Sequence, residues 1–180
     1  MKQIRIHGRG GQGVVTASEL VAMAAFFSGH EAQAFPSFGV ERTGAPIEAF
    51  VRIDDKEIRT REQIYSPDYI IILDASLLGS TDIMYGSYRN TKVIINTTKT
   101  KEEIDIDIPA KNIYLINATE IALKILGRNI VNTIMLGAIA KNTNLLTIAG
   151  AKKAVEEKFK EKGKDIINKN IKAVKLIYEN

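Results

Sequence analysis

The sequence Gly8-Arg9-Gly10-Gly11-Gln12-Gly13 separates two segments whose apolar residues recur at different spacings. Before it, Lys2-Gln3-Ile4-Arg5-Ile6 alternates polar and apolar side chains, which predicts a first β-strand. After it, residues 12–27 predict a helix, because their apolar side chains recur at helical spacing. This helical stripe consists of Val14, Ala17, Leu20, Val21, Ala24 and Phe27. Strand, glycine turn and helix in this order are the context in which a G-x-G-x-x-G motif indicates a phosphate-binding turn.

The glycines of this motif have different predicted roles. Gly8 allows the tight turn, Gly10 allows a ligand to approach the backbone, and Gly13 allows the helix to pack close to the strand. The helix then begins with unpaired N–H groups and the positive end of its dipole, which together attract anions. We therefore predict a phosphate site formed by Gly8, Arg9, Gly10, Gly11, Gln12 and Gly13, with Arg9 adding a full charge. The alternative is a glycine-rich turn that only packs against its neighbours.

A nicotinamide dinucleotide is not the favoured ligand. Such sites place an acidic residue roughly 20 positions after the glycines, at the end of the second strand, where it binds the ribose hydroxyls. The predicted second strand, Glu31 to Phe35, runs into Pro36 and Ser37 and has its only carboxylate, Glu31, at its start.

The composition is that of one ordinary globular domain. The chain has 180 residues, of which 45% are hydrophobic and 26% charged, and a chain of this size buries roughly 70% of its unfolded surface. No linker, repeat or low-complexity tract divides it, so we expect a single domain over residues 1–180. No stretch reaches the length needed to span a bilayer and the N-terminus lacks a secretory segment, so we expect a cytoplasmic protein with no membrane partner.

The residue types present exclude several kinds of chemistry. The chain has no cysteine, which excludes disulfides, thiol catalysis and iron–sulfur clusters held by this chain. Its two histidines, His7 and His30, have no spacing that supports a metal site, and we expect both to be polar turn residues. The net charge is only +4 and the late lysines are interleaved with acidic residues, so nucleic acid is not an expected partner.

The remaining strands predict a mixed sheet. Residues 46–53 alternate as a half-buried strand, and a turn at residues 54–56 is expected to pair it with a short strand around residues 57–59. This hairpin gives the sheet an antiparallel portion. Buried parallel strands are predicted over the apolar runs at residues 69–74, 92–96 and 112–116.

Helices alternate with these strands. A capping box at Asn117 to Glu120 begins a helix that continues to Leu126. The first helix, residues 12–27, has one charged residue, so it needs a further layer or another subunit on its second side. Further helices are predicted from residue 132 and over residues 148–162 and 165–178. We predict an α/β protein, a three-layer Rossmann-like sandwich with a mostly parallel, partly mixed sheet.

Other candidate binding residues lie in loops and at element ends. The loop from Ala34 to Pro46 contains glycines, prolines and aromatic anchors, and its polar candidates are Ser37, Arg42, Thr43 and Gly44. Asp74 ends a predicted strand, where it could bind a hydroxyl, although capping the next segment is the favoured role. Asn132 could cap a helix or contact a ligand.

Residues 8–20 and 32–46 closely resemble the gamma subunit of pyruvate and other 2-oxoacid:ferredoxin oxidoreductases. Residues 67–78 and 132–138 are similar to the same family, so the likeness covers nearly the whole chain. The loop with Phe35-Pro36-Ser37-Phe38-Gly39 is more similar to the pyruvate branch than to the 2-oxoglutarate branch.

The resemblance implies a subunit of a heterotetrameric enzyme of anaerobic metabolism, pyruvate synthase. This enzyme converts pyruvate, coenzyme A and oxidised ferredoxin to acetyl-CoA, carbon dioxide and reduced ferredoxin, or catalyses the reverse. In the family, thiamine diphosphate with Mg²⁺ lies between the alpha and beta subunits, and [4Fe-4S] clusters lie on the beta and delta subunits. The implied partners are therefore the alpha, beta and delta subunits, with ferredoxin reached through the complex. No residue of this chain is expected to be catalytic or to bind a metal.

The resemblance also implies that this chain contacts coenzyme A. Residues 8–13 would contact phosphate, and Arg42 with Thr43 and Gly44 would bind an anion through charge-assisted hydrogen bonds. Asn132 and Ser37 would add polar contacts. Three alternatives remain: a gamma subunit for another 2-oxoacid such as 2-oxoisovalerate or 2-oxoglutarate, a purely scaffolding subunit, and an NAD-binding oxidoreductase, which the missing carboxylate opposes.

Overall fold

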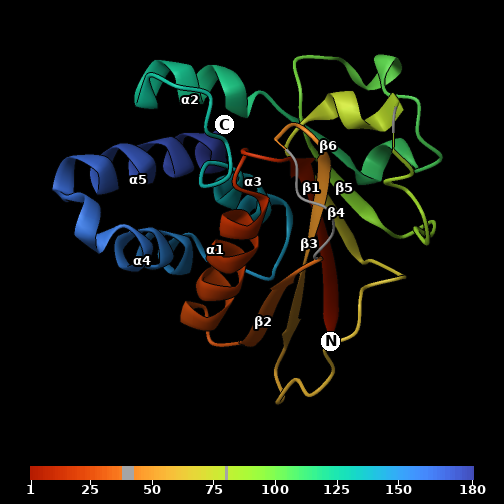
Figure 1. Ribbon diagram of the computed structural model, residues 1–180, viewed down its shortest axis with the longest axis horizontal. Coiled ribbons are helices and arrows are strands. Elements are labelled where there is room, and N and C mark those ends of the chain that lie inside the picture. The colour runs from red at the N-terminus through yellow and green to blue at the C-terminus, as the bar shows by residue number, and fades with distance from the viewer. Residues whose placement is uncertain (38–42, 80) are drawn as a thin grey trace.

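The computed structural model describes residues 1–37, 43–79 and 81–180. These residues form a six-stranded sheet in the order β2-β3-β1-β4-β5-β6 (Figure 1). The strands are β1 (Lys2–Arg9), β2 (Glu31–Pro36), β3 (Pro46–Asp54), β4 (Tyr69–Ile72), β5 (Lys92–Asn96) and β6 (Ile113–Ile116). β1, β4, β5 and β6 run parallel, whereas β3 is antiparallel to both β1 and β2. The predicted α/β fold with a mostly parallel, partly mixed sheet is confirmed.

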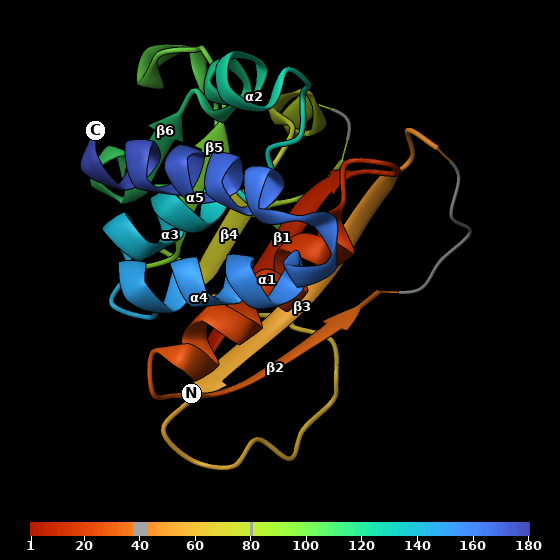
Figure 2. The same ribbon diagram turned by 90° about the vertical axis from the view of Figure 1, so that its left-hand side faces the viewer.

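The α-helices gather on one side of the sheet (Figures 1 and 2). They are α1 (Val14–Phe27), α2 (Ala118–Leu126), α3 (Met135–Asn142), α4 (Ile148–Lys158) and α5 (Lys164–Glu179). α1 and α3 lie nearest the strands, and α4 and α5 pack over them. In the part of the chain that the structure describes, no helix combines the length and the apolar character that crossing a membrane requires.

The larger core lies between these helices and the sheet. Ile4 and Ile6 of β1 and Ile71 of β4 point to this side and pack with Leu20 and Val21 of α1. All five side chains are at most 1% exposed. Burying one aliphatic side chain of this size contributes roughly 1.5–3 kcal/mol, so this layer is the main source of stability.

A thinner third layer covers the opposite face of β4 and β5. The intervening residues of the same strands point there, and they form a second core with short 3-10 helical turns rather than with α-helices. This second core consists of Ile70, Ile72, Leu77, Ile83, Val93, Ile95, Ile104, Ile108 and Ile113. Both faces of the parallel strands are therefore covered, as their continuous apolar runs predict.

The side of α1 that faces away from the sheet is covered by α4. This confirms the prediction that the nearly uncharged first helix packs against a further layer. The approach is close because α4 carries Gly150, where a Cβ would collide with the carbonyl oxygen of Ala24 and the hydroxyl of Ser28. Thr147 caps α4 by accepting a hydrogen bond from the amide of Gly150 at 2.9 Å. α1 therefore needs no partner subunit to bury most of its length, although Phe26 at its end remains 61% exposed.

The predicted hairpin between residues 46–53 and 57–59 is wrong. Residues 57–59 form no strand, and β3 pairs instead with β1 on one side and β2 on the other. β3 is also not half-buried, because Phe50 and Arg52 on its polar-patterned face are 1% and 2% exposed. Alternation along a segment predicts a strand, but its neighbours in the sheet depend on contacts distant in sequence.

His7 is not a turn residue. It lies inside β1, pairs with Ile72 of β4 and Glu48 of β3, and is only 6% exposed. Burial, and then the nearby charge of Arg5, lowers the pKa of His7 to about 3. The ring is therefore neutral at physiological pH.

Asp68 joins the start of β4 to the start of β1. Its carboxylate accepts hydrogen bonds from the Lys2 ammonium, the Gln3 amide and the Tyr88 hydroxyl, each at 2.9 Å. Burial by itself would raise the pKa of this carboxyl, but the hydrogen bonds from Lys2, Gln3 and Tyr88 outweigh it and lower the pKa below its usual value.

Replacing Asp68 with Asn is expected to lower the free energy of unfolding at pH 7 by about 1–3 kcal/mol, because charge-assisted hydrogen bonds are lost. The folded-state pKa lies below the unfolded value of about 3.9, so the wild-type contribution is complete above that pH and disappears as the pH falls through the folded pKa. Urea unfolding at pH 7 and at lower pH measures the difference, with Asp105→Asn, an exposed aspartate, as control. Equal losses for both variants would contradict this role of Asp68.

Candidate functional site

The candidate site lies at the carboxyl ends of the parallel strands, at the upper end of the sheet in Figure 1. β1 and β4 are neighbours in the sheet, but the chain leaves them in opposite directions. From β1 it passes through α1 to β2, and from β4 it continues to β5 on the other side. Such a point leaves a crevice where open α/β sheets bind ligands. Gly8 and Arg9 end β1 there, residues 10–13 follow it, and Asp74 follows β4.

The glycine segment packs tightly, but Gly8 lies inside β1, paired with Ile47, and does not form the tight turn predicted for it. A Cβ at Gly8 would collide with the side chain of Val14. Gly13 has φ 74°, and a Cβ there would collide with the amide group of Asn132, whose Nδ2 donates a long hydrogen bond of 3.4 Å to the Gly13 carbonyl. Gly11 also has a positive φ of 91°, but no described residue lies close to the place of a Cβ there. The turn thus depends on glycine both for its backbone angles and for close packing.

Asp74 organises the side chains around this turn. It accepts hydrogen bonds from Nε2 of Gln12 at 2.9 Å and from the amide and hydroxyl of Ser76 at 3.0 and 2.7 Å. The Arg9 guanidinium lies 3.3 Å from the same carboxylate. Burial would raise the pKa of Asp74, but these hydrogen bonds and the charge of Arg9 lower it. The predicted capping role of Asp74 is confirmed, and the charge of Arg9 is already balanced by Asp74.

Three amides of the turn are used internally. The Arg9 amide donates to Oε1 of Gln12 at 2.7 Å, the Gly10 amide to the Ala45 carbonyl at 2.8 Å, and the Gln12 amide to the Arg9 carbonyl at 3.0 Å. The amides of Gly11 and Gly13 donate to no described residue. The first turn of α1 has no intrahelical acceptors for its N–H groups and no side-chain cap among the described residues. These amides are what the turn offers to an anion.

A polar cavity of about 310 Å³ opens beside this network. Besides Gln12, Asp74 and Ser76, it is lined by polar side chains from the end of β5, the segment after β5, the start of α2 and the segment after α2. They are Asn96, Thr97, Thr98, Asn117, Thr119 and Asn129. Sequence reasoning did not select them, although Thr97, Thr98 and Asn117 follow predicted strands directly, which was the available signal. The lining is rich in amides and hydroxyls, which suit neutral hydrogen-bonding groups of a ligand.

The other predicted site residues are placed differently. Gly44 contacts the turn, because its amide donates to the Gly10 carbonyl at 3.1 Å and its carbonyl accepts from Arg9 at 3.1 Å. Thr43 is exposed next to it. Ser37 lies at the end of β2, where its amide donates to the Glu48 carbonyl, and it lines a different cavity. Arg42 lies outside the described residues, so its place in the site stays a prediction.

The sheet order bears on the dinucleotide alternative. In an NAD site the second strand lies beside the first, so that its terminal carboxylate reaches the ribose. Here β3 lies between β1 and β2, and β2 ends at Pro36 with no carboxylate. Both the missing acid and the inserted strand oppose an NAD site. In residues 1–37, 43–79 and 81–180, no three His, Cys, Asp or Glu side chains are grouped to hold a metal ion.

The fold and this edge together define an α/β protein of the Rossmann-like class, with its ligand edge at the ends of β1 and β4. The family follows from comparison with known proteins. The chain belongs to the family described as pyruvate ferredoxin/flavodoxin oxidoreductase, whose model matches residues 3–180.

Relatives with established names are similar over almost the full chain. The common subunit gamma of the pyruvate/ketoisovalerate oxidoreductases of Thermococcus litoralis is 50% identical, covering 99% of this chain and 96% of its own. Pyruvate synthase subunit PorC of Methanocaldococcus jannaschii is 51% identical with the same coverage. The crystal structure of pyruvate oxidoreductase subunit PORC of Thermotoga maritima is 35% identical with a TM-score of 0.83, covering 99% of this chain and 96% of that one. The resemblance to gamma subunits of multi-subunit oxidoreductases is confirmed.

Proposed function

We propose that this chain is the gamma subunit of a pyruvate:ferredoxin oxidoreductase and that it contacts coenzyme A at the edge formed by residues 8–13 and the polar cavity. The complex would oxidise pyruvate with coenzyme A to acetyl-CoA and carbon dioxide, reducing ferredoxin, or run in reverse. Alpha, beta and delta subunits would carry thiamine diphosphate, Mg²⁺ and the [4Fe-4S] clusters. This chain would supply binding and assembly rather than the chemistry of decarboxylation.

One observation supports the coenzyme A contact: Gln12 lines a polar cavity at the switch point of the sheet, and the amides of its neighbours Gly11 and Gly13 donate to no described residue. Coenzyme A bears a diphosphate and a ribose phosphate, which helix N-termini bind well. The cavity is at the small end of the range for ligand pockets, roughly 300–1,000 Å³, so it suits a part of the coenzyme. Because Asp74 holds Arg9, the phosphate would lie on the side of Gly11 and α1, away from that carboxylate.

The name of one relative supports a wider substrate range as the second candidate. The relative from Thermococcus litoralis is a common subunit of pyruvate and ketoisovalerate oxidoreductases. A chain so similar to it could assemble with more than one set of partner subunits. Under this candidate the 2-oxoacid is selected by the other chains, while the contact with coenzyme A stays the same.

The test is a charge introduced into the cavity of the assembled complex. Asn129→Asp places a carboxylate on its exposed rim, and Asn144→Asp makes the same change on the surface outside it. We expect Asn129→Asp to raise the KM for coenzyme A about tenfold, a loss of about 1.4 kcal/mol, with thiamine content unchanged. Arg42→Ala is expected to act in the same direction.

Calorimetric titration with coenzyme A and with NAD(H) separates the alternatives. Binding of coenzyme A that Asn129→Asp weakens and Asn144→Asp does not supports the proposal. An unchanged affinity for coenzyme A in Asn129→Asp, in a complex that assembles normally, would leave only the scaffolding role. The hydrogen bonds that Gln12 and Asp74 form within the turn favour the scaffolding role. Binding of NAD(H) would favour the dinucleotide alternative.

A further inference from the structure

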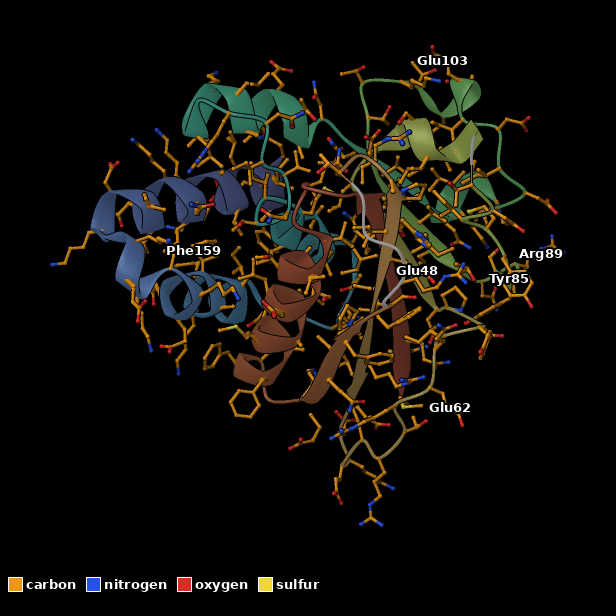
Figure 3. The ribbon with its side chains drawn as sticks, in the orientation of Figure 1. Glu48, Glu62, Tyr85, Arg89, Glu103 and Phe159 are labelled. Atoms are coloured by element: carbon orange, nitrogen blue, oxygen red, sulfur yellow. The ribbon has the colours of Figure 1, made fainter. Side chains whose placement is uncertain are left out.

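A second cavity, of about 530 Å³, opens on the face of the sheet opposite the helices. Its floor consists of Arg5 and His7 of β1 and Glu48 and Phe50 of β3. Figure 3 shows Glu48 and Tyr85 on the side of the molecule away from Phe159, which lies among the helices. We call this cavity the tyrosine groove, after Tyr65 and Tyr85 in its lining.

Two buried arginines hold the walls of the tyrosine groove. Nη2 of Arg5 donates to the carbonyls of Ile83 and Tyr85 at 2.6 and 2.7 Å, which attaches one wall to β1. Nη2 of Arg52 donates to the carbonyl of Glu62 at 2.6 Å, which attaches the other wall to β3. Arg5 and Arg52 are 4% and 2% exposed. Hydrogen bonds from buried charged groups are strong and directional, so both walls have a defined position.

The two walls also pack against each other through their backbones. Gly86 has φ 68°, and a Cβ there would collide with the carbonyl oxygen of Tyr65. Tyr65 and Tyr85 are thus fixed through their main chains, yet each side chain is 60% exposed. Rigid, exposed tyrosines beside an apolar groove are typical of protein interfaces, because they bury a large area at low cost in conformational entropy.

The groove is locally acidic on a chain whose net charge is +4. Glu48 and Asp82 line it, and neither side chain makes a hydrogen bond or ion pair with a described residue. Among the described residues of the lining, the only cation is Arg5, which is bound to carbonyls, and His7 is neutral. Two carboxylates therefore face one guanidinium. A cationic side chain entering between the tyrosines would gain both ion pairing and cation–π contact.

We propose that the tyrosine groove is the docking site for another subunit of the oxidoreductase, which inserts a lysine or arginine side chain from an otherwise apolar segment. The interaction lies on the face opposite α1 and does not depend on the contact with coenzyme A. The tyrosines supply the buried area, and Glu48 and Asp82 supply the charge complementarity that selects this partner.

The test uses the complete complex, co-expressed with one tagged subunit. Tyr85→Ala and the charge-neutral pair Glu48→Gln/Asp82→Asn are compared with Tyr178→Ala and Glu179→Gln/Asp105→Asn, which make the same changes at exposed positions outside the groove. We expect each groove variant to raise the dissociation constant of this subunit at least tenfold. The double substitution Glu48→Gln/Asp82→Asn, which removes two negative charges, should also weaken the dependence of that constant on ionic strength. The controls should leave both quantities within about twofold of wild type.

A photoreactive amino acid at position 85 provides a readout that does not depend on loss of function. It is expected to cross-link to another subunit of the complex, and mass spectrometry should place the cross-link beside a lysine or arginine. Cross-linking to a second copy of this chain, or no cross-link from an assembled complex, would overturn the proposal. So would unchanged dissociation constants in groove variants whose thermal unfolding matches wild type.

Discussion

Lowering the pH from 7 to 4 is expected to lower the free energy of unfolding by about 3 kcal/mol through His7 alone. The folded-state pKa is about 3 because the ring is buried and lies near Arg5, whereas the unfolded value is about 6.5. Between these values the unfolded chain binds a proton that the folded chain does not, so stability falls with pH in this window. Each pH unit within it contributes about 1.4 kcal/mol.

Urea unfolding of wild type and His7→Gln between pH 7 and pH 4 measures this contribution. Gln has no titratable ring, so wild type should lose about 3 kcal/mol of stability relative to His7→Gln as the pH falls from 7 to 4. The same substitution at His30, in the turn between α1 and β2, reports any general effect of replacing a histidine. A difference between wild type and His7→Gln that stays constant with pH would show that the unfolded and folded rings titrate alike.

Gly13→Ala is expected to destabilise the fold more than Gly11→Ala, although both residues have positive φ. A left-handed backbone costs a non-glycine residue about 1–2 kcal/mol at either position. Of the two positions, only Gly13 would bring the new methyl group into collision with a described side chain, that of Asn132, whereas no described residue lies near the methyl group at Gly11. Overpacking of this kind adds about 1–3 kcal/mol. The pair therefore separates the backbone requirement from close packing.

Equilibrium unfolding of both variants, and of Gly13→Ala combined with Asn132→Ala, completes the comparison. Truncating Asn132 removes the collision together with the hydrogen bonds of its amide group, so Gly13→Ala should cost less stability in an Asn132→Ala background than in wild type, by about the overpacking term. If Gly11→Ala and Gly13→Ala lose the same stability, the contact between Gly13 and Asn132 contributes nothing beyond the backbone. The KM for coenzyme A in the complex then reports, separately, whether the geometry of the turn matters to the ligand.

Local signals predicted the elements of this fold well. The strand, glycine turn and helix at the N-terminus were confirmed because hydrophobic spacing and glycine angles act over a few residues. The same holds for the cap at Asn117, whose side chain accepts from the Glu120 amide and donates to its carboxylate. Asp74 was correctly predicted to cap the segment after β4 for the same reason.

Predictions that depended on distant contacts were the ones that failed or were incomplete. The predicted hairpin after β3 was wrong because β1 and β2 pair with the two edges of β3 and leave none for residues 57–59. His7 was wrongly expected to be a turn residue. Its burial results from the strands on both sides of β1 and from residues 63–65, 77 and 81–85, which cover that face of the sheet. The polar lining of the cavity was missed because Asn96 at the end of β5, Thr119 in α2 and Asn129 after α2 are brought together only by the fold.

The order of apolar, glycine and polar residues determined by itself most of the strands and helices of this protein, and it placed a glycine turn between the first strand and the first helix. These are short-range properties, since each depends on a residue and its near neighbours. Only the tertiary structure decided that β3 separates β1 from β2 and that Asp74 forms an ion pair with Arg9. The same is true of the two buried arginines that bind the backbones of the segments carrying the exposed tyrosines. Those features come from groups far apart in the chain, whose meeting depends on how the whole sheet is assembled.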